Sequence, residues 1–187
     1  MKKMTIRDAK KMYTTYGYQL FGDEIRALSS QDPDSCNQKI SNSNYLHALF
    51  LTAFMFDNTS WSLDMLTGGN DGFLETLATK FYQALDRIKQ NSGKARIIVT
   101  SENKTQFLTD TEKKYDNLEV FCLPSSCPEN KEHFIVCDSL MVRAEEPHMA
   151  ITDESDADVI RATVHINNCD EGKVFSVKFN DFWTLLQ

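Results

Sequence analysis

The hydrophobic and polar positions along the chain form blocks that predict several helices. Residues 5 to 28 and 72 to 91 repeat apolar side chains at three- and four-residue spacing, which is typical of helices with one buried face. The run "YLHALFLTAFMF", from Tyr45 to Phe56, is apolar on all sides and predicts a buried helix that Asn44 caps. This run is about one third too short to cross a bilayer, which takes roughly 20 residues. We therefore expect no membrane span.

Short apolar runs between these helices predict strands. They lie at residues 61–66, 95–100 and 118–123, and a helical pattern stands between each pair. The order strand, helix, strand, helix, strand favours parallel pairing with right-handed crossovers. A later strand is expected at residues 159–166, and "FNDFW" predicts a C-terminal helix that begins at Asn180 or Asp181.

The chain is therefore expected to form one α/β domain with a mixed, largely parallel sheet flanked by helices. The polar, turn-rich segment 29–43 predicts a loop and is the best candidate for a linker. It divides an N-terminal helical extension and loop, residues 1–43, from an α/β domain at residues 44–187. Residues 133 to 144 add a late β-hairpin, with an apolar strand, a turn at Asp138–Ser139 and a second strand.

The hairpin is unusually rich in polar chemistry. "KEHFIVCDSLMVRAEEPH", residues 131 to 148, holds two histidines, an arginine and three glutamates. Arg143 and Glu145 are two residues apart, so both face the same side of a strand. They are either an edge ion pair of little energetic value or part of a polar constellation with His133 and His148, because the two hairpin ends meet. His133 itself is either a hydrogen-bonded residue at a strand end or a ligand-binding or residual catalytic histidine.

The order of elements, with "FLETLATKFYQALDRI" between two strands, the late hairpin and the terminal "FNDFW" helix, resembles one half of the phospholipase D-like superfamily. The resemblance covers roughly residues 45 to 187. The signature of that family is His-x-Lys-x4-Asp on the hairpin, followed by Gly-Ser and Asn. The family's histidine attacks a phosphodiester, and its lysine and asparagine hold phosphate oxygens. Aligning the hairpin turns puts Lys131 at the nucleophile position, His133 at the lysine and Asp138 at the aspartate.

The remainder of the motif is also altered. In this alignment Glu145 and Glu146 take the Gly-Ser positions, and His148 takes that of the asparagine. Aligning His133 with the nucleophile instead puts Ile135 at the lysine and Leu140 at the aspartate. Neither alignment reproduces the signature, and two glutamates beside a phosphate would repel it. The resemblance thus implies a degenerate member of the superfamily.

Two functions remain open. The first is a non-catalytic phospholipase D-like binding or regulatory domain of unknown ligand. The alternative is a phosphodiesterase or nuclease-type hydrolase with an altered active site, in which His133 is nucleophile or base and Arg143 and His148 hold phosphate. A nucleic acid or phosphorylated ligand is compatible with the resemblance, but the net charge of −7 does not support it. The candidate binding residues are Lys131, Asp138, Arg143, Glu145 and His148.

Cofactor chemistry has little support in the sequence. The five cysteines are odd in number and irregularly spaced, which indicates reduced thiols and a cytoplasmic protein. The spacing of Cys122, Cys127, His133 and Cys137 does not fit a zinc site. The acidic segment 152–158 lacks the glycine and terminal glutamate of a calcium loop. We therefore expect no metal and no cofactor. The resemblance implies a homodimer, because single-repeat relatives build their cleft across a two-fold axis.

Overall fold

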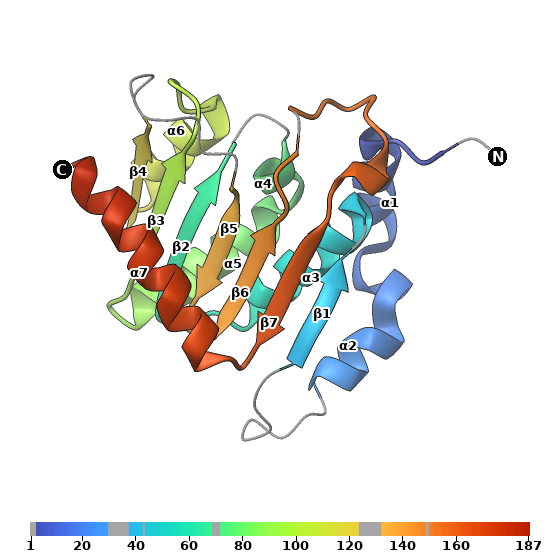
Figure 1. Ribbon diagram of the computed structural model, residues 1–187, viewed down its shortest axis with the longest axis horizontal. Helices are drawn as coiled ribbons and strands as arrows, with labels where there is room; N and C mark the ends of the chain where they lie inside the picture. The colour runs from blue at the N-terminus through green and yellow to red at the C-terminus, as the bar shows by residue number, and fades with distance from the viewer. Residues whose placement is uncertain (1–2, 30–37, 43, 69–71, 124–131, 149) are drawn as a thin grey trace.

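A seven-stranded sheet forms the centre of the computed structural model (Figure 1). The structure describes residues 3–29, 38–42, 44–68, 72–123, 132–148 and 150–187. Within these residues the strand order is β1-β7-β6-β5-β2-β3-β4. The strands are β1 Gln38–Asn42, β2 Ser62–Thr67, β3 Lys94–Val99, β4 Leu118–Cys122, β5 Phe134–Cys137, β6 Met141–Glu145 and β7 Ala162–Ile166.

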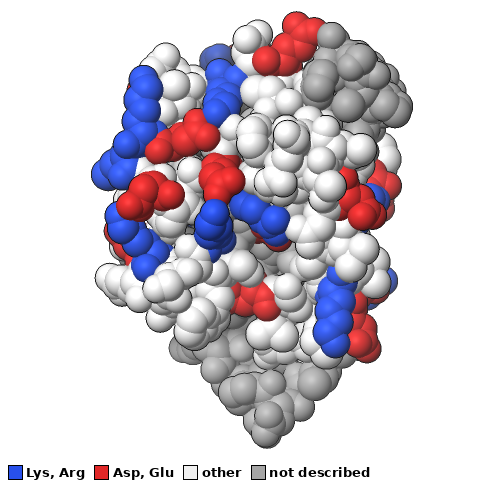
Figure 2. Space-filling model, turned by 90° about the vertical axis from the view of Figure 1, so that its left-hand side faces the viewer, with Lys and Arg blue, Asp and Glu red and all other residues white. Residues whose placement is uncertain are grey.

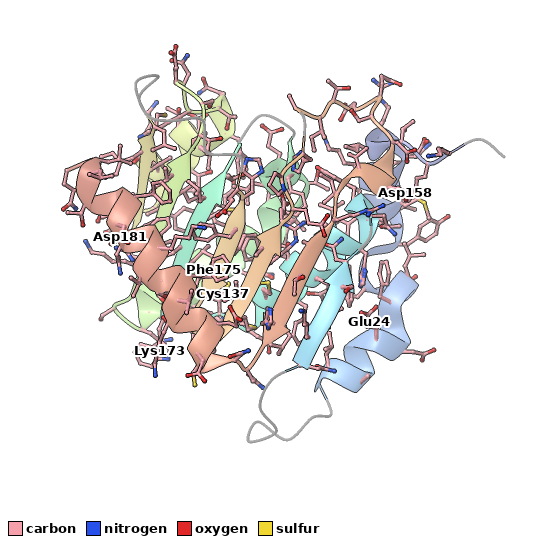
Figure 3. All side chains as sticks on the ribbon, in the orientation of Figure 1. Glu24, Cys137, Asp158, Lys173, Phe175 and Asp181 are labelled. Carbon is pink, nitrogen blue, oxygen red and sulfur yellow. The ribbon has the colours of Figure 1, made fainter. Side chains whose placement is uncertain are left out.

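Helices cover both faces of the sheet. Of the described helices, only α7, Cys169–Leu185, crosses one face (Figure 1), where its Phe179 joins Phe134 of β5 in an apolar layer. Phe175 of α7, labelled in Figure 3, packs against the Phe134 ring of β5 with centroids 5.2 Å apart. The other face carries the larger core. Its helices are α1 Ile6–Tyr16, α3 Tyr45–Asp57, α4 Phe73–Thr76, α5 Ala78–Gln90 and α6 Gln106–Lys114. The remaining helical segments are η1 Gly17–Phe21, α2 Gly22–Ser29 and the short turn η2 Ala157–Val159.

The mixed sheet confirms the fold class expected from the sequence. Strands β2, β3 and β4 pair in parallel, as the alternation over residues 61–123 predicted. The hairpin β5–β6 then returns to the other side of β2, where β5 pairs antiparallel. Strands β7 and β1 continue the antiparallel half. Parallel pairing is therefore confined to one side of the sheet, and the turn-linked strands make the other.

Two local predictions were wrong. The segment 29–43 was expected to be a loop, but residues 38–42 form β1 and pair antiparallel with β7. Ile40 is the only apolar residue in this edge strand, so the alternation that marks a strand is almost absent. The C-terminal helix does not begin at Asn180 or Asp181. It begins after Asn168, whose side chain accepts the Glu171 N–H at 3.1 Å.

The late hairpin is present where it was expected. Asp138 and Ser139 both have left-handed backbone angles, with φ of 54° and 53°, which an aspartate tolerates in a tight turn. The Asp138 carboxylate accepts backbone N–H bonds from Ser60, Trp61 and Ser62 at 2.7 to 2.8 Å. These bonds hold the hairpin turn against the start of β2. Within the described residues, no helix is both long and apolar enough to span a membrane.

Candidate functional site

Sheet register brings three polar side chains of the hairpin to one face. His133 stands just before β5 and lies opposite Glu145, since the Glu145 N–H donates to the His133 carbonyl at 2.8 Å. Arg143 precedes Glu145 by two residues and pairs with Ile135, so it shares that face. Ile135 belongs to the core on the α3 side of the sheet. All three polar side chains are therefore directed into the larger apolar layer, away from α7.

Glu145 is the centre of the resulting cluster, which consists of His133, Arg143, Glu145 and His148. Its Oε2 atom accepts hydrogen bonds from His133 Nδ1 and from His148 Nε2, each at 3.1 Å. Its other oxygen, Oε1, accepts from the Arg143 guanidinium. The two imidazole rings meet nearly edge to face, with centroids 5.3 Å apart and an interplanar angle of 75°. Both carboxylate oxygens are thus fully engaged.

The cluster is largely removed from solvent. The exposed fraction of the side chain is 2% for Arg143, 12% for Glu145 and 11% for His148, and it reaches 22% for His133. Arg143 Nη2 donates to Asn42 Oδ1 of β1 at 3.3 Å, and its guanidinium lies 5.5 Å from the centre of the Phe73 ring. Arg143 Nε is buried without a hydrogen-bond partner among the described residues. His133 is consequently the most accessible member of the cluster.

The charge of Glu145 is compensated inside the protein. Burial by itself would raise the pKa of this carboxyl. The Arg143 guanidinium and the hydrogen bonds from the two histidines outweigh burial and hold the Glu145 pKa well below its usual range. Glu145 is therefore ionised at neutral pH, and its charge is balanced by Arg143. The sequence-based expectation that Glu145 repels an anion assumed a carboxylate without such a partner.

The cluster lies where the strand pairing of the sheet changes from parallel to antiparallel. It stands beside the carboxyl end of β2, between the parallel strands and the antiparallel hairpin, which is where open α/β sheets commonly bind ligands. Gly68 follows β2, and a Cβ atom at this position would be 3.2 Å from His133 Cε1. A small hollow, with room for about one water molecule, shares Phe73 with the cluster, since the Phe73 ring contacts the Arg143 guanidinium. Its lining consists of Thr67, Gly72, Phe73, Leu74, Glu75, Thr105, Phe107 and Leu108.

The remaining candidates lie elsewhere. Asp138 occupies the turn end of the hairpin, remote from His133, and both oxygens of its carboxylate accept hydrogen bonds from backbone N–H groups. Lys131 lies outside the described residues. Cys137, labelled in Figure 3, is buried at the turn end of β5, and burial raises the pKa of its thiol to about 12. The described residues that could hold a metal ion are instead His133, Glu145 and His148, whose donor atoms lie within 4.8 Å of one another.

Three contributors to the site were missed from sequence. Asn42 fell in the segment expected to be a loop, and its strand has too little apolar alternation to be recognised. Gly68 stands in a stretch whose glycines are typical of a turn, and only the structure shows that a Cβ there would crowd the His133 ring at 3.2 Å. Phe73 lies in the segment 72–91 that was predicted to bury one face, and it is a core residue, but its ring also contacts the Arg143 guanidinium.

Comparison with solved structures identifies proteins with a similar fold. The sequence matches no family model and no curated protein. Among solved structures, the archaeal chromatin protein TrmBL2, described as showing a novel mode of DNA binding, matches with a TM-score of 0.59 and 19% identity. That match covers 96% of this chain and 63% of TrmBL2, so the chain spans less than two thirds of that protein.

Two phospholipase D-like structures match almost over their whole length. Nuc from Salmonella typhimurium, a phospholipase D family member, has a TM-score of 0.52 and 15% identity, covering 79% of this chain and 93% of Nuc. NucT from Helicobacter pylori has a TM-score of 0.52 and 10% identity, covering 78% of this chain and 93% of NucT. The chain therefore has a phospholipase D-like fold, as the order of its elements predicted.

Proposed function

We propose that this phospholipase D-like domain is a binding or regulatory module that does not carry out the phosphodiester chemistry of the superfamily. The observation that carries the proposal is that the hydrogen-bonding groups of the cluster bond to one another. The Glu145 carboxylate accepts hydrogen bonds from His133, Arg143 and His148 at the same time. In the alignment of the hairpin turns, His133 and His148 stand where the family has its phosphate-holding lysine and asparagine. Here both side chains are directed to a carboxylate.

The electrostatics of the cluster support the same proposal. A phosphate clamp needs preorganised donors that are aimed at the place where negative charge develops. In this cluster the Arg143 guanidinium is buried and donates to Glu145 and to Asn42. Releasing it toward an anion would leave Glu145 unpaired in a poorly solvated place, which is costly. Binding of a phosphate by Arg143 therefore requires the ion pair between Arg143 and Glu145 to break first.

The surface charge gives no support to a nucleic-acid backbone as the ligand. DNA binding, described for TrmBL2, depends on basic side chains that neutralise phosphates. In Figure 2 the blue and red side chains are interleaved on the face shown. Several basic residues pair directly with acidic ones, as Lys94 does with Glu119 and Lys104 with Glu112. With a net charge of −7, the chain is better suited to a small or protein ligand than to DNA.

Hydrolysis assays test this proposal. The purified chain is incubated with a chromogenic phosphodiester and with single- and double-stranded DNA, beside His133→Ala and the control His165→Ala on β7. We expect background rates for all three proteins. A wild-type rate that falls in His133→Ala but not in His165→Ala would overturn the non-catalytic assignment.

One observation favours the alternative function, an altered hydrolase. The Glu145 carboxylate bonds His133 Nδ1, which leaves Nε2 as the atom that could act as nucleophile or base. A Cβ on Gly68 would be 3.4 Å from this Nε2, so the ring edge is directed toward the end of β2. In that function Arg143 and His148 would hold the phosphate. The same assay decides between the two functions, since only the hydrolase requires His133.

The assembly and the other expected binding residues belong to this proposal as well. A single phospholipase D-like half that completes its cleft across a two-fold axis would be a homodimer, and the irregularly spaced cysteines favour a cytoplasmic one. Analytical ultracentrifugation at micromolar concentration should then give the mass of two chains, and a strict monomer would contradict it. Lys131 lies outside the described residues and stays a candidate ligand contact from the sequence, whereas Asp138 would act indirectly by fixing the hairpin.

A further inference from the structure

We propose that His133, Glu145 and His148 bind one divalent transition-metal ion of the kind that prefers imidazole, such as Zn²⁺ or Co²⁺. The inference rests on the proposed function in one respect, because it takes the same cluster as the binding site and names its ligand. Two histidines and one carboxylate are a ligand set that zinc accepts while keeping a further position for water or another ligand. Calcium and magnesium prefer oxygen ligands, so the two imidazoles select against them.

The positions of the donor atoms agree with a metal centre. His133 Nδ1 and His148 Nε2 each lie 3.1 Å from Glu145 Oε2, and the three atoms lie within 4.8 Å of one another. With metal–ligand bonds of about 2.0–2.1 Å, neighbouring ligands of a tetrahedral ion are about 3.3 Å apart. Two of the three edges are already close to this length. The third edge, between the two imidazole nitrogens, is at most 4.8 Å and would have to shorten by up to about 1.5 Å for tetrahedral coordination.

Surrounding residues hold two of the ligands in place. Arg143 binds Oε1 of Glu145 and so leaves Oε2 directed to the histidines, as outer partners of ligating carboxylates commonly do. The backbone bond between Glu145 N–H and the His133 carbonyl fixes their spacing across the hairpin. Gly68 allows the His133 ring to lie against the end of β2. Two of the three ligands are thus held at the paired open end of the hairpin, Glu145 as the last residue of β6 and His133 next to the first residue of β5.

Arg143 also limits the strength of binding. Its charge balances Glu145 when no ion is bound, so the empty site is stable. A divalent ion beside the guanidinium meets repulsion that partly offsets the ligand bonds. We therefore expect a reversible site that a chelator empties, in contrast to structural zinc sites without which a domain does not fold.

Another histidine–glutamate pair provides a comparison within the chain. His47 Nε2 lies 3.0 Å from Glu24 Oε1, and its ring stacks beside Phe21 (Glu24 is labelled in Figure 3). This pair has the same donor types and a similar distance, but it forms no group of three possible ligands among the described residues. A metal that merely associates with any histidine–carboxylate pair would bind at both places.

The experiment titrates chelator-treated protein with Co²⁺ and with Zn²⁺, using calorimetry for both and visible absorption for Co²⁺. The variants are His133→Gln, His148→Gln and the matched control His47→Gln, each checked for folding by circular dichroism. We expect one ion per chain and a metal-dependent rise in Tm for the unaltered protein and for His47→Gln. Both effects should be lost in His133→Gln and in His148→Gln. An unaltered chain without stoichiometric binding, or full binding in the two cluster variants, would overturn the inference.

A second measurement needs no variant and covers the case in which a substitution prevents folding. The unaltered chain is treated with diethyl pyrocarbonate with and without Zn²⁺, and modified histidines are mapped by mass spectrometry. Zn²⁺ should protect His133 and His148 but not His165, and equal modification with and without the ion would contradict the site. Absent metal binding together with background hydrolysis removes only this inference. Hydrolysis that depends on His133 removes the non-catalytic assignment, whatever the result of the titration.

Discussion

Arg143 and Glu145 form an ion pair between neighbouring positions on one strand face, with only 2% and 12% of their side chains exposed. Exposed pairs of this kind contribute little to stability, but a buried charge without its partner is expensive. The pair therefore controls both the stability of the hairpin end and the orientation of the two histidines around it.

Substituting one partner of this pair should lower the free energy of unfolding much more than substituting both partners together. We expect Arg143→Met and Glu145→Met each to lower the free energy of unfolding by about 3–5 kcal/mol, because each leaves a buried charge uncompensated. The double variant should lose far less than the sum, since it replaces the pair by apolar side chains. Urea unfolding of the four proteins measures this double-mutant cycle. Strictly additive losses would show that the two groups do not interact in solution.

Removing the Asp138 carboxylate should loosen the hairpin turn. Asp138→Ala loses the acceptor of three backbone N–H groups and puts alanine at a φ of 54°, so we expect a loss of about 2–4 kcal/mol. Asp138→Asn keeps one side-chain oxygen and tolerates the left-handed angle, and it should lose clearly less. Thermal and urea unfolding compare the two variants. An Asp138→Ala variant as stable as the unaltered chain would show that the carboxylate bonds contribute nothing.

The contact between α7 and the hairpin turn depends on a glycine. A Cβ on Gly172 would stand 1.9 Å from the Ser139 carbonyl oxygen, so Gly172→Ala must push helix and turn apart, at about 1–3 kcal/mol. Gly22 is the matched control, because it has helical angles and no atom within 4 Å of its added Cβ. Gly22→Ala should be neutral or stabilising by about 0.5 kcal/mol. Urea unfolding should separate the two variants, and similar behaviour would contradict the close contact.

Thiol reactivity should distinguish Cys137 from Cys169. Burial raises the pKa of the Cys137 thiol to about 12, so between pH 7 and pH 10 it stays protonated and unreactive in the folded state. Cys169 is exposed at the start of α7 and should alkylate first. Because the unfolded thiol ionises near about 8.5, the stability that Cys137 contributes is present below that pH and is lost as pH rises toward 12. Iodoacetamide labelling followed by peptide mapping tests the order of reaction.

Much of the fold was predictable because its strongest signals are local. The alternation of strands and helices over residues 61–123 and the hairpin turn at Asp138–Ser139 follow from apolar periodicity and turn chemistry. Strand β1 was not predictable, because an edge strand with a single apolar residue carries hardly any pattern. The start of α7 was hidden by Val174 and Val177, because β-branched residues are typical of strands. In the structure both valines lie on the exposed side of α7, with 61% and 60% exposure.

The site was predictable in part for the same reason. Residues at the two ends of a hairpin meet, so the gathering of His133, Glu145 and His148 follows from the turn alone. The compensation of Glu145 does not, because it requires Arg143 to be covered by Phe73 and to reach Asn42, which is 101 positions away in the sequence. Long-range contacts of this kind leave no trace in local spacing.

The row of residues that crosses the sheet at Glu145 has a consequence for the order of folding. Asn42 pairs with Ala162, and Ala162 pairs with Glu145, so the row joins the early strand β1 to the late strand β7. Contacts between such distant segments close long loops and tend to form late. The pocket of Arg143 is therefore complete only when the chain through β7 has emerged and both segments have docked. A nascent or truncated chain can form the hairpin, but it lacks the Asn42 partner that steadies the guanidinium.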